Sequence, residues 1–340
     1  MRRAPRVTVA GAGVLGLSTA LALADAGCVV TVCDPGGPNA SSVAAGMIAP
    51  VFEAVLDEAA APHLDLLLAA RDAWAGLAAR AGIVLDRTGA MAVGSEDWLE
   101  RIEGRFTALH LHAAELGGEA ARALAPGLTE AVDAALLTRE DWRVDAPQGL
   151  AALAGAGEAA GVRFERRAVR AREDADVLVL ATGAREGLAD LAPELSVLSP
   201  IKGHIVRVAG PSAGAVVRAQ GIYAAPGSGM AFGATMEHGR ADVAVEEDKA
   251  GPLLAAGLRL FPALRGQPVQ IAAGVRAATP DGLPMAGWSE APGVALAAGP
   301  RRNGWLVAPL VARIVSACVT GRDAGPHAAR LDPARFRGGR

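Results

Sequence analysis

The hydrophobic pattern at the start of the chain predicts a strand, a helix and a second strand in close succession. Residues 6–10 are β-branched and end at a glycine, which is typical of a strand. A helical pattern follows over residues 17–26 and ends at Gly27. Residues 28–33 form a second apolar run that Asp34 closes. This order predicts a βαβ unit with two parallel strands.

The first connection of this unit has the glycine spacing of a dinucleotide-binding turn. Residues 11–16 read Gly-Ala-Gly-Val-Leu-Gly. Gly11 permits a tight turn, Gly13 lets the backbone approach a pyrophosphate, and Gly16 lets the helix pack on the strand. The helix N-terminus offers free N–H groups to the phosphates. Asp34 lies 18 residues after Gly16 and can accept hydrogen bonds from an adenosine ribose. NAD and FAD share that ribose, so these residues do not choose between them.

Two further stretches fit either a ligand site or ordinary packing. Residues 41–50 are small and polar and then apolar, which lets a backbone press against a flat ligand but also suits a buried loop. Residues 176–180 form a near-continuous apolar run that suits a central parallel strand. Ligands of such sheets lie beyond the carboxyl ends of the strands, so Thr182 and Gly183 are expected near a cofactor. A plain junction of strand and turn is the alternative.

Arginines mark two stretches near the C-terminal end. Arg276 stands in the apolar strand pattern of residues 274–278, before a Pro-Asp-Gly turn. Its planar guanidinium binds carboxylates bidentately, so a protein ion pair and a substrate contact fit equally well. Residues 299–309 lead through two arginines into a helical pattern that ends near Cys318. The start of this helix would favour negative charge on a reduced flavin, whereas a surface turn with solvated arginines is the alternative.

Composition excludes several classes of protein. The 340 residues are enough for about two domains, and 51% apolar with 20% charged residues can fill a core, which excludes a disordered chain. The net charge of −3 gives no basic surface for nucleic acid. Cys28, Cys33 and Cys318 have neither metal-site nor disulfide spacing, which indicates a reducing cytoplasm and no metal. No apolar stretch is long enough to predict a membrane-spanning helix.

Together these segments resemble the D-amino-acid oxidase superfamily of flavoenzymes, and most closely its glycine oxidase branch. They occur in the family's order along the whole chain. The resemblance implies FAD as the cofactor and excludes NAD. The matching segments are residues 11–16, 42–50, 181–183, 233–236, 279–284 and 302–304.

The resemblance also implies which side chains meet the substrate. Arg276 corresponds to the arginine that pins the substrate carboxylate, and Tyr223 to a tyrosine of the substrate pocket. Arg302 corresponds to a second arginine near substrate and flavin. Met47 and Met236 correspond to residues close to the flavin ring. These five residues are the expected catalytic group.

A longer set of residues is expected to bind FAD. It includes Val169, on a shortened strand at residues 168–170, which corresponds to a valine whose backbone meets the adenine. The expected FAD-binding residues are Gly11, Gly13, Val14, Leu15, Gly16, Asp34, Pro35, Ser41, Ser42, Ala45, Gly46, Met47, Val169, Ala181, Thr182, Gly183, Arg302, Asn303, Gly304, Trp305 and Leu306.

Three features of the sequence depart from the family's pattern and leave the identity of the substrate open. Pro300 and Arg301 stand where the family often has an aromatic residue or a histidine before Arg-Asn-Gly. Gly221 stands where a polar residue often precedes the tyrosine. The β-meander before Ala181 is reduced to a few residues between Val169 and the next strand.

The expected fold is α/β. It has a Rossmann-like FAD-binding domain with an inserted α+β substrate domain that contains an antiparallel sheet. The FAD-binding domain is expected in three pieces, residues 1–82, 142–198 and 272–340, with the substrate domain in residues 83–141 and 199–271. Residues 199–245 alternate strand patterns with glycine-rich turns, which suits an antiparallel sheet with one face on the active site.

The expected reaction is the oxidative deamination of a small amino acid or amine, such as glycine, sarcosine or a small D-amino acid. The carboxylate is held by Arg276, and a hydride leaves Cα for FAD to give an imine, with oxygen as the final acceptor and peroxide as product. A dehydrogenase with another electron acceptor, an enzyme that oxidises a cyclic imino acid or a non-carboxylate amine, and an idle flavin-binding module are the alternatives. The oligomeric state is left open, including a homo-oligomer.

Overall fold

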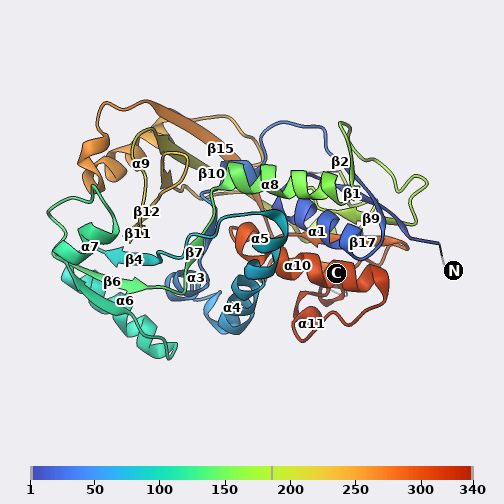
Figure 1. Cartoon of the computed structure of the whole chain (residues 1–340), viewed down its shortest axis with the longest axis horizontal. Coiled ribbons are helices and arrows are strands. Elements are labelled where there is room, and N and C mark those ends of the chain that lie inside the picture. The colour runs from blue at the N-terminus through green and yellow to red at the C-terminus, as the bar shows by residue number, and fades with distance from the viewer. Residues whose placement is uncertain (1–2, 185–186, 338–340) are drawn as a thin grey trace.

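The computed structural model describes residues 3–184 and 187–337, which fold into two lobes that lie side by side (Figure 1). Each lobe is built around one large sheet, of six strands in one and nine in the other. A two-stranded sheet of β3 (Met47–Ile48) and β7 (Trp142–Arg143) is a third, minor sheet. The architecture is the expected α/β one.

The first sheet has the Rossmann-like order that the sequence predicts. In spatial order its strands are β16 (Met285–Trp288), β17 (Val294–Ala298), β9 (Val177–Leu180), β1 (Arg6–Ala10), β2 (Val29–Cys33) and β8 (Arg163–Glu165). All neighbours from β17 to β8 are parallel, and β16 joins at the edge as an antiparallel strand. The carboxyl ends of the parallel strands therefore meet at one edge of the sheet.

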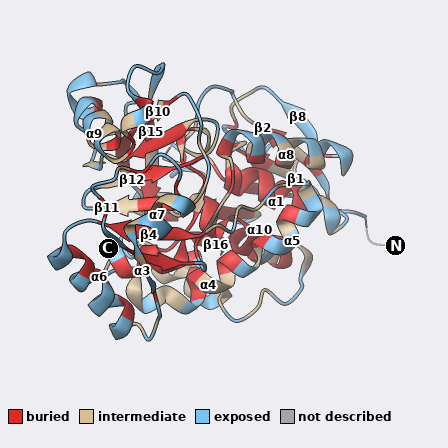
Figure 2. Ribbon diagram, turned by 60° about the vertical axis from the view of Figure 1, so that its left-hand side comes forward, coloured by how far each residue is buried: buried red, intermediate tan, exposed pale blue. Residues whose placement is uncertain are grey.

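Three helices of this lobe bury their apolar faces against one another. They are α1 (Val14–Asp25), α8 (Ala146–Ala159) and α10 (Gly304–Thr320). Helix α1 packs against both of the others, which explains why it is apolar nearly all round. It starts at Val14, three residues before the expected pattern, because Gly13 is the extended residue that caps it. Figure 2 shows the buried residues concentrated in these helices and in the sheets.

The second sheet is mixed, where an antiparallel sheet was expected. In spatial order its strands are β14 (Glu237–His238), β10 (Ser199–Val208), β13 (Met230–Gly233), β12 (Ile222–Ala225), β11 (Val216–Ala219), β4 (Ala90–Val93), β6 (Ala134–Thr138) and β5 (Ala114–Gly117), with β15 (Val269–Ala278) beside β10. Residues 199–245 are antiparallel as predicted. The exception is β11 beside β4, which run parallel. These two strands are far apart in the sequence, so no hairpin fixes their relative direction.

Strand β15 crosses the expected boundary between residues 271 and 272. It pairs with β10 along its whole length, from Val269 opposite Val208 to Ala278 opposite Ser199. Residues 272–278 therefore lie in the second sheet, and Arg276 with them. The rest of the expected division stays a prediction, and its outermost residues 1–2 and 338–340, with 185–186, lie outside the described residues.

The expected strand at residues 168–170 is wrong. The segment after β8 has no regular structure, because β2, the partner of β8, ends at Cys33. Arg167 instead donates to Glu165 at 2.7 Å and to Glu173 at 2.7 and 2.9 Å, which folds the segment back on itself.

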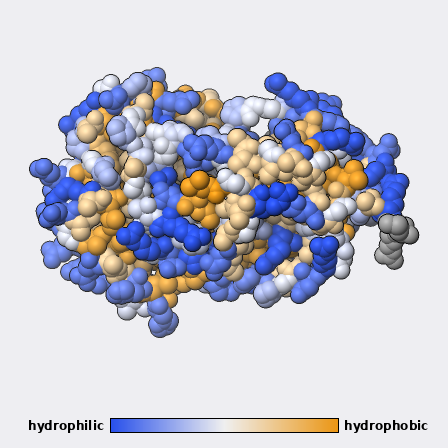
Figure 3. All heavy atoms as spheres, in the orientation of Figure 1, coloured by the Kyte–Doolittle hydropathy of each residue, from blue (hydrophilic) through white to orange (hydrophobic). Residues whose placement is uncertain are grey.

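The remaining elements cover the two sheets. Helix α9 (Glu247–Leu260) packs against β10, β12 and β13 on one face of the second sheet. The other helices are α2 (Ala40–Val43), α3 (Pro50–Leu56), α4 (Leu64–Asp72), α5 (Trp74–Ala81), α6 (Glu96–Ala108), α7 (Gly118–Leu124) and α11 (Ala328–Leu331), and four short 3₁₀ turns are Ala61–His63, Pro193–Val197, Pro262–Leu264 and Pro333–Phe336. Within residues 3–184 and 187–337 no helix is both long and apolar enough to cross a bilayer. Figure 3 shows apolar atoms in small patches among hydrophilic ones on the face it draws.

Candidate active site

Two adjoining cavities lie where the lobes meet. The first has a volume of about 450 Å³ and lies against the carboxyl ends of β1, β2 and β9. The second has a volume of about 410 Å³ and lies against one face of the second sheet. The residues that line both cavities are Ala40, Ala44, Gly274, Arg276, Arg302 and Trp305. The two cavities therefore adjoin at these six residues.

Most of the expected FAD-binding residues line the first cavity. These are Gly11, Gly13, Val14, Leu15, Asp34, Pro35, Ser41, Val169, Ala181, Thr182, Gly183, Arg302, Gly304 and Trp305. Four others, Ala45, Gly46, Met47 and Asn303, line the second cavity. The last three, Gly16, Ser42 and Leu306, line neither.

The three residues outside both cavities have structural roles. A Cβ on Gly16 would overlap the carbonyl oxygen of Gly11, so Gly16 allows α1 to cross β1 closely. The hydroxyl of Ser42 accepts from the N–H of Asn39 at 3.1 Å in the capping box of α2. Leu306 is 1% exposed inside the core around α10.

The glycine turn forms a cradle without side chains. Gly11 has φ +109°, and a Cβ there would overlap the carbonyl oxygen of Ala181. A Cβ on Gly13 would meet only the Ser41 hydroxyl oxygen, at 3.2 Å, so the space above Gly13 is open. Helix α10 also begins at this cavity, and no side chain in residues 3–184 or 187–337 caps its first turn. The cradle and the free helix end fit the pyrophosphate of a dinucleotide.

Asp34 orders the rim of this cradle. One oxygen accepts from the N–H of Ala12 at 2.8 Å and the other from the N–H of Gly36 at 2.7 Å. Each carboxylate oxygen has two acceptor positions, so both can still accept a hydroxyl proton. The arrangement fits a ribose at the end of β2.

Neighbouring strands bring the side chains of the second cavity onto one face of the sheet. Arg218 on β11 lies opposite Tyr223 on β12, and Tyr223 lies opposite Gly233 on β13. Gly203 on β10 lies opposite Gly274 on β15, two residues before Arg276. Residues directly opposite each other in a sheet point to the same face. This register, which motifs do not show, assembles the cavity wall.

Two glycines make room for the large side chains of this wall, and sequence reasoning missed one of them. A Cβ on Gly233 would overlap the phenol of Tyr223. A Cβ on Gly203 would lie 2.6 Å from Nη2 of Arg276 and 2.6 Å from the carbonyl oxygen of Thr235. Glycine inside a strand often marks such a close approach, and Gly203 interrupts a strand pattern in this way.

Arg276 carries a charge that has no anionic partner in the described part of the protein. Nη1 donates to the carbonyl oxygen of Thr235 at 3.2 Å. Among the described residues, no carboxylate oxygen lies within 4.0 Å of its guanidinium nitrogens. Burial lowers the pKa of Arg276, and the positive charges of Arg302 and Arg301 act in the same direction. A ligand carboxylate would supply the missing partner.

Arg302, in contrast, is already paired. Nε donates to the carboxylate of Glu53 at 2.7 and 2.9 Å, and Nη2 lies 3.0 Å from Asp57. Asn303 also donates to Glu53, at 2.9 Å, and Arg301 binds Asp57. Burial acts to raise the pKa of Asp57, but the hydrogen bond from Arg301 and the charge of Arg302 hold it below its usual value. This network anchors the start of α10 to α3 at the junction of the cavities.

The other expected catalytic residues all line the second cavity. Burial raises the pKa of the Tyr223 phenol, although the charges of Arg276 and Arg218 oppose the rise, so the phenol remains a hydrogen-bond donor at neutral pH. Met47 lies at the start of β3, and Met236 is 38% exposed at the rim. The structure thus brings Arg276, Tyr223, Met47 and Met236 together.

A strap, residues 234–246, joins β13 to α9 and contributes to both cavities. Ala241 and Val243 line the first cavity and Met236 the second. Two buried side chains of β10 hold the strap. The first is Lys202, whose Nζ donates to Asp242 at 2.6 Å and to Glu246 at 3.2 Å.

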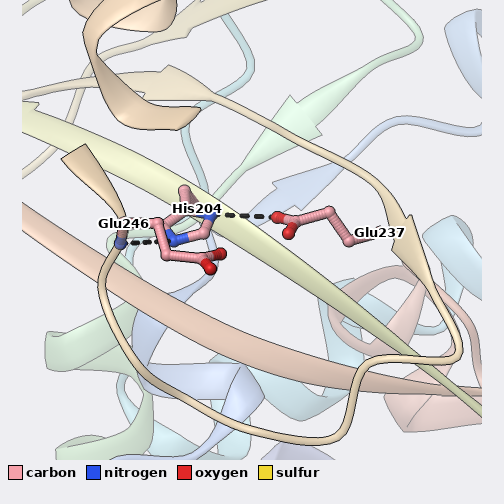
Figure 4. Close-up of side chains that lie close together, drawn as sticks. All are labelled: His204, Glu237 and Glu246. Atoms are coloured by element: carbon pink, nitrogen blue, oxygen red, sulfur yellow. Dashed lines mark hydrogen bonds and ion pairs between the residues drawn. The ribbon is translucent and has the colours of Figure 1, made fainter. Parts of the chain in front are cut away.

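The second is His204, which lies between two carboxylate residues of the strap (Figure 4). Nδ1 lies 3.1 Å from Oε1 of Glu237, and Nε2 accepts from the backbone N–H of Glu246 at 3.1 Å. Nε2 is therefore the acceptor, and Nδ1 carries the proton that it donates to Glu237. Both ring nitrogens serve the tether, so the cluster does not need a metal to explain it.

We expect the free energy of unfolding to change with pH as Asp141 titrates. It is buried, and burial raises its pKa to about 6 from an ordinary 3.8. The folded protein then binds more protons than the unfolded chain, so the contribution of Asp141 falls as pH rises through this range. The unfolding free energy of wild type minus that of Asp141→Asn should fall by about 2 kcal/mol from about pH 4.5 to about pH 7.5. Denaturant titrations at each pH measure it, and a constant difference would contradict it.

Replacing Gly203 by alanine should displace the Arg276 guanidinium, because the new Cβ would occupy its position. We expect kcat/KM for a carboxylate substrate to fall about 10- to 30-fold, since part of the charge-assisted hydrogen bonding is lost. The matched control is Gly155→Ala in α8, where a Cβ meets nothing within 4 Å. Steady-state kinetics on both variants measures the effect, and equal values would contradict this account of Gly203.

The comparisons with known proteins agree with this geometry. A family model described as FAD dependent oxidoreductase matches residues 6–318. Glycine oxidase from Pseudomonas aeruginosa is 30% identical over 362 residues, which cover 94% of this chain and 95% of that protein. The bifunctional protein ThiO/ThiG of Synechocystis is 29% identical and is matched over 99% of this chain and 55% of its own length.

A solved structure shows the same likeness in three dimensions. Glycine oxidase from Geobacillus kaustophilus has a TM-score of 0.80 and 28% identity, with 98% of this chain and 100% of that chain covered. The glycine cradle, the start of α10 and the adjoining cavities fit the cofactor that the family model names. The chain therefore belongs to the family of FAD dependent oxidoreductases, and its cofactor is FAD.

Proposed function

We propose that the chain catalyses the oxidative deamination of a small amino acid. An amino acid, water and oxygen would give the 2-oxo acid, ammonia or the parent amine, and hydrogen peroxide. Glycine, sarcosine and small D-amino acids are the expected substrates. The observation that carries the proposal is Arg276, a half-buried arginine that lines both cavities and lacks an anionic partner among the described residues.

The chain's contribution in this proposal is the binding and orientation of the substrate. FAD, when bound, supplies the acceptor for two electrons. Arg276 would bind the substrate carboxylate, and its hydrogen bond to Thr235 holds the guanidinium in place. Tyr223, whose hydroxyl adjoins Gly233, would donate a second hydrogen bond to the carboxylate. Two fixed contacts restrict the rotation of the substrate and direct its Cα–H toward the first cavity.

The proposal does not require a protein base at the substrate nitrogen. The only acidic residue that lines the second cavity, within the part of the chain that the structure describes, is Glu53. Its carboxylate is occupied by Arg302 and Asn303. The amine would therefore enter as the free base, with its proton released to water. Activity should rise with pH until the substrate amine is deprotonated.

Arg302 takes a different role in the proposal from the one that resemblance implies. Its guanidinium binds Glu53 and Asp57, so it would position the start of α10 beside the cofactor. Oxygen is the proposed electron acceptor, and mixing the reduced enzyme with oxygen in a stopped-flow instrument distinguishes an oxidase from a dehydrogenase. The free thiols of Cys28, Cys33 and Cys318 suit a reducing compartment such as the cytoplasm.

An anaerobic substrate panel tests the proposal. The purified protein should show a flavin spectrum that bleaches with one or more of glycine, sarcosine, D-alanine and D-proline. Simple amines without a carboxylate should bleach it far more slowly, because they offer nothing to Arg276. A protein that carries flavin but is reduced by none of the amino acids would contradict the proposal.

A further inference from the structure

We infer that Arg218 forms a second carboxylate-binding subsite in the second cavity, and that the preferred substrates are amino acids with an additional carboxylate. The inference rests on the proposed function, in which Arg276 binds the first carboxylate. It adds the class of substrate, which the three departures from the family's pattern had left open.

The sheet places Arg218 on the wall of the cavity beside Tyr223. The two residues lie opposite each other on β11 and β12, and both line the second cavity. The Arg218 guanidinium lies 5.6 Å from the centroid of the Tyr223 ring and 5.8 Å from that of Phe52. These two aromatic rings hold the guanidinium in position without using its hydrogen-bond donors.

The donors of Arg218 have no partner in the described part of the chain. Nε is buried without a hydrogen bond. The terminal nitrogens have no hydrogen bond to residues 3–184 or 187–337, and no carboxylate oxygen of those residues lies within 4.0 Å. A buried donor without an acceptor is costly, so such groups in native proteins usually meet water, an ion or a ligand. Arg218 lines the second cavity, and its terminal nitrogens, unlike Nε, are not fully enclosed, so a ligand in the cavity can reach them.

Neither of the two nearby acidic residues, Glu53 and Asp141, accepts a hydrogen bond from Arg218. Glu53 is bound by Arg302 and Asn303. Asp141 contributes a favourable charge to Arg218, but its two oxygens accept the N–H groups of Val51 and Phe52 at 2.8 and 3.0 Å. Asp141 also does not line the cavity. Asp141 thus stabilises the charge of Arg218 from outside the cavity lining, while the terminal donors of Arg218 keep no partner among the described residues.

Two guanidinium groups with free donors therefore face one cavity, with the Tyr223 phenol near both. Tyr223 lies opposite Arg218 in the sheet and lines the same cavity as Arg276. The cavity wall has three arginines and one glutamate within the described residues. One of those arginines is neutralised by the glutamate. A single ligand with two carboxylates would satisfy the other two, and the planar fork of each arginine suits bidentate binding.

Two matched pairs of substrates test the inference. Iminodiacetate differs from sarcosine, and D-aspartate from D-alanine, by one added carboxylate. We expect wild type to have the higher kcat/KM for the diacid in at least one pair. Arg218→Gln should reduce the ratio of diacid to monoacid kcat/KM about 30-fold in that pair, because charge-assisted bonds to the second carboxylate are lost. The control is Arg87→Gln, an exposed arginine that stacks on Trp142 outside both cavities, and its ratio should match wild type.

Binding without turnover provides an independent measurement. Glutarate and butyrate are the carbon analogues of iminodiacetate and sarcosine and cannot be deaminated. Calorimetry should show tighter binding of glutarate to wild type and the loss of this preference in Arg218→Gln. Arg218→Lys should retain part of it, since the charge remains while the fork is lost.

The outcomes separate this inference from the proposed function. If sarcosine and D-alanine reduce the flavin but iminodiacetate and D-aspartate do not, the inference is overturned and the proposed function stands. A flavin reduced by none of the four compounds would overturn the inference, and a flavin that glycine and D-proline also fail to reduce would overturn the proposed function as well. Arg218→Gln leaves Asp141 without its cation and could unfold the protein, so Asp141→Asn/Arg218→Gln removes both charges in one variant. An unchanged diacid preference in that folded double variant would also overturn the inference.

Discussion

Replacing Arg276 by alanine should lower kcat/KM for a carboxylate-bearing amino acid by about two to three orders of magnitude. The substrate α-carboxylate would lose the cation that binds it, and loss of one partner of a buried charge pair costs about 3–5 kcal/mol. The protein itself should remain folded, because Arg276 makes a single side-chain hydrogen bond, to Thr235, among the described residues. Steady-state kinetics with glycine, together with the flavin spectrum and melting temperature, measures both effects.

Arg276→Lys and a simple amine are the matched controls for this prediction. Lysine keeps the charge and loses the fork, so its kcat/KM should lie between wild type and alanine. An amine without a carboxylate gains nothing from Arg276 and should be oxidised at similar rates by wild type and Arg276→Ala. A near-wild-type kcat/KM for glycine in Arg276→Ala would remove this residue from the substrate site.

Replacing Gly13 by alanine should weaken FAD binding by about 10- to 100-fold while the apoprotein remains as stable as wild type. In the structure the new Cβ meets only the Ser41 hydroxyl, at 3.2 Å, and Gly13 has φ −75°, which alanine adopts without strain. The pyrophosphate of FAD would need the same space, and overpacking of this kind costs about 1–3 kcal/mol. Flavin fluorescence titrations of the apoprotein measure the affinity.

Gly16→Ala distinguishes cofactor contact from packing within the same turn. Its Cβ would overlap the backbone of Gly11, so this variant should lose stability even without FAD. Gly13→Ala should instead show its defect only in FAD binding. Equal melting temperatures of the two apoproteins, or unchanged FAD affinity in Gly13→Ala, would contradict the placement of the pyrophosphate over Gly13.

The start of the first lobe could be predicted from the sequence because its elements follow one another directly along the chain. The strand, the glycine turn and the helix follow one another within residues 6–33, and the structure confirms them as β1, α1 and β2. The second sheet was harder, because its pairs join segments far apart in the chain. The parallel contact of β4 with β11 and the pairing of β15 with β10 are of this kind.

The candidate site shows the same division between local and distant information. The motif at the start of the chain predicted the glycine turn, and the family resemblance implied Arg276 and Tyr223; the structure places all three on the two adjoining cavities. The partners of Arg302 on α3 could not be predicted, since they lie about 250 residues away in the sequence. The position of Arg218 depends on the register of β11 against β12, which no local pattern specifies.

The two cavities are lined largely by different strands, and this has a consequence for how the substrate preference of such an enzyme can change by mutation. Strands β11 and β12 shape only the second cavity, whereas the glycine turn and the end of β9 shape only the first. Arg276 on β15 belongs to both, and β15 is tied to β10 over ten residue pairs. Mutations in β11, and in β12 at positions other than Tyr223, could therefore change which substrate side chain is accepted while nucleotide affinity and the binding of the α-carboxylate by Arg276 and Tyr223 stay intact.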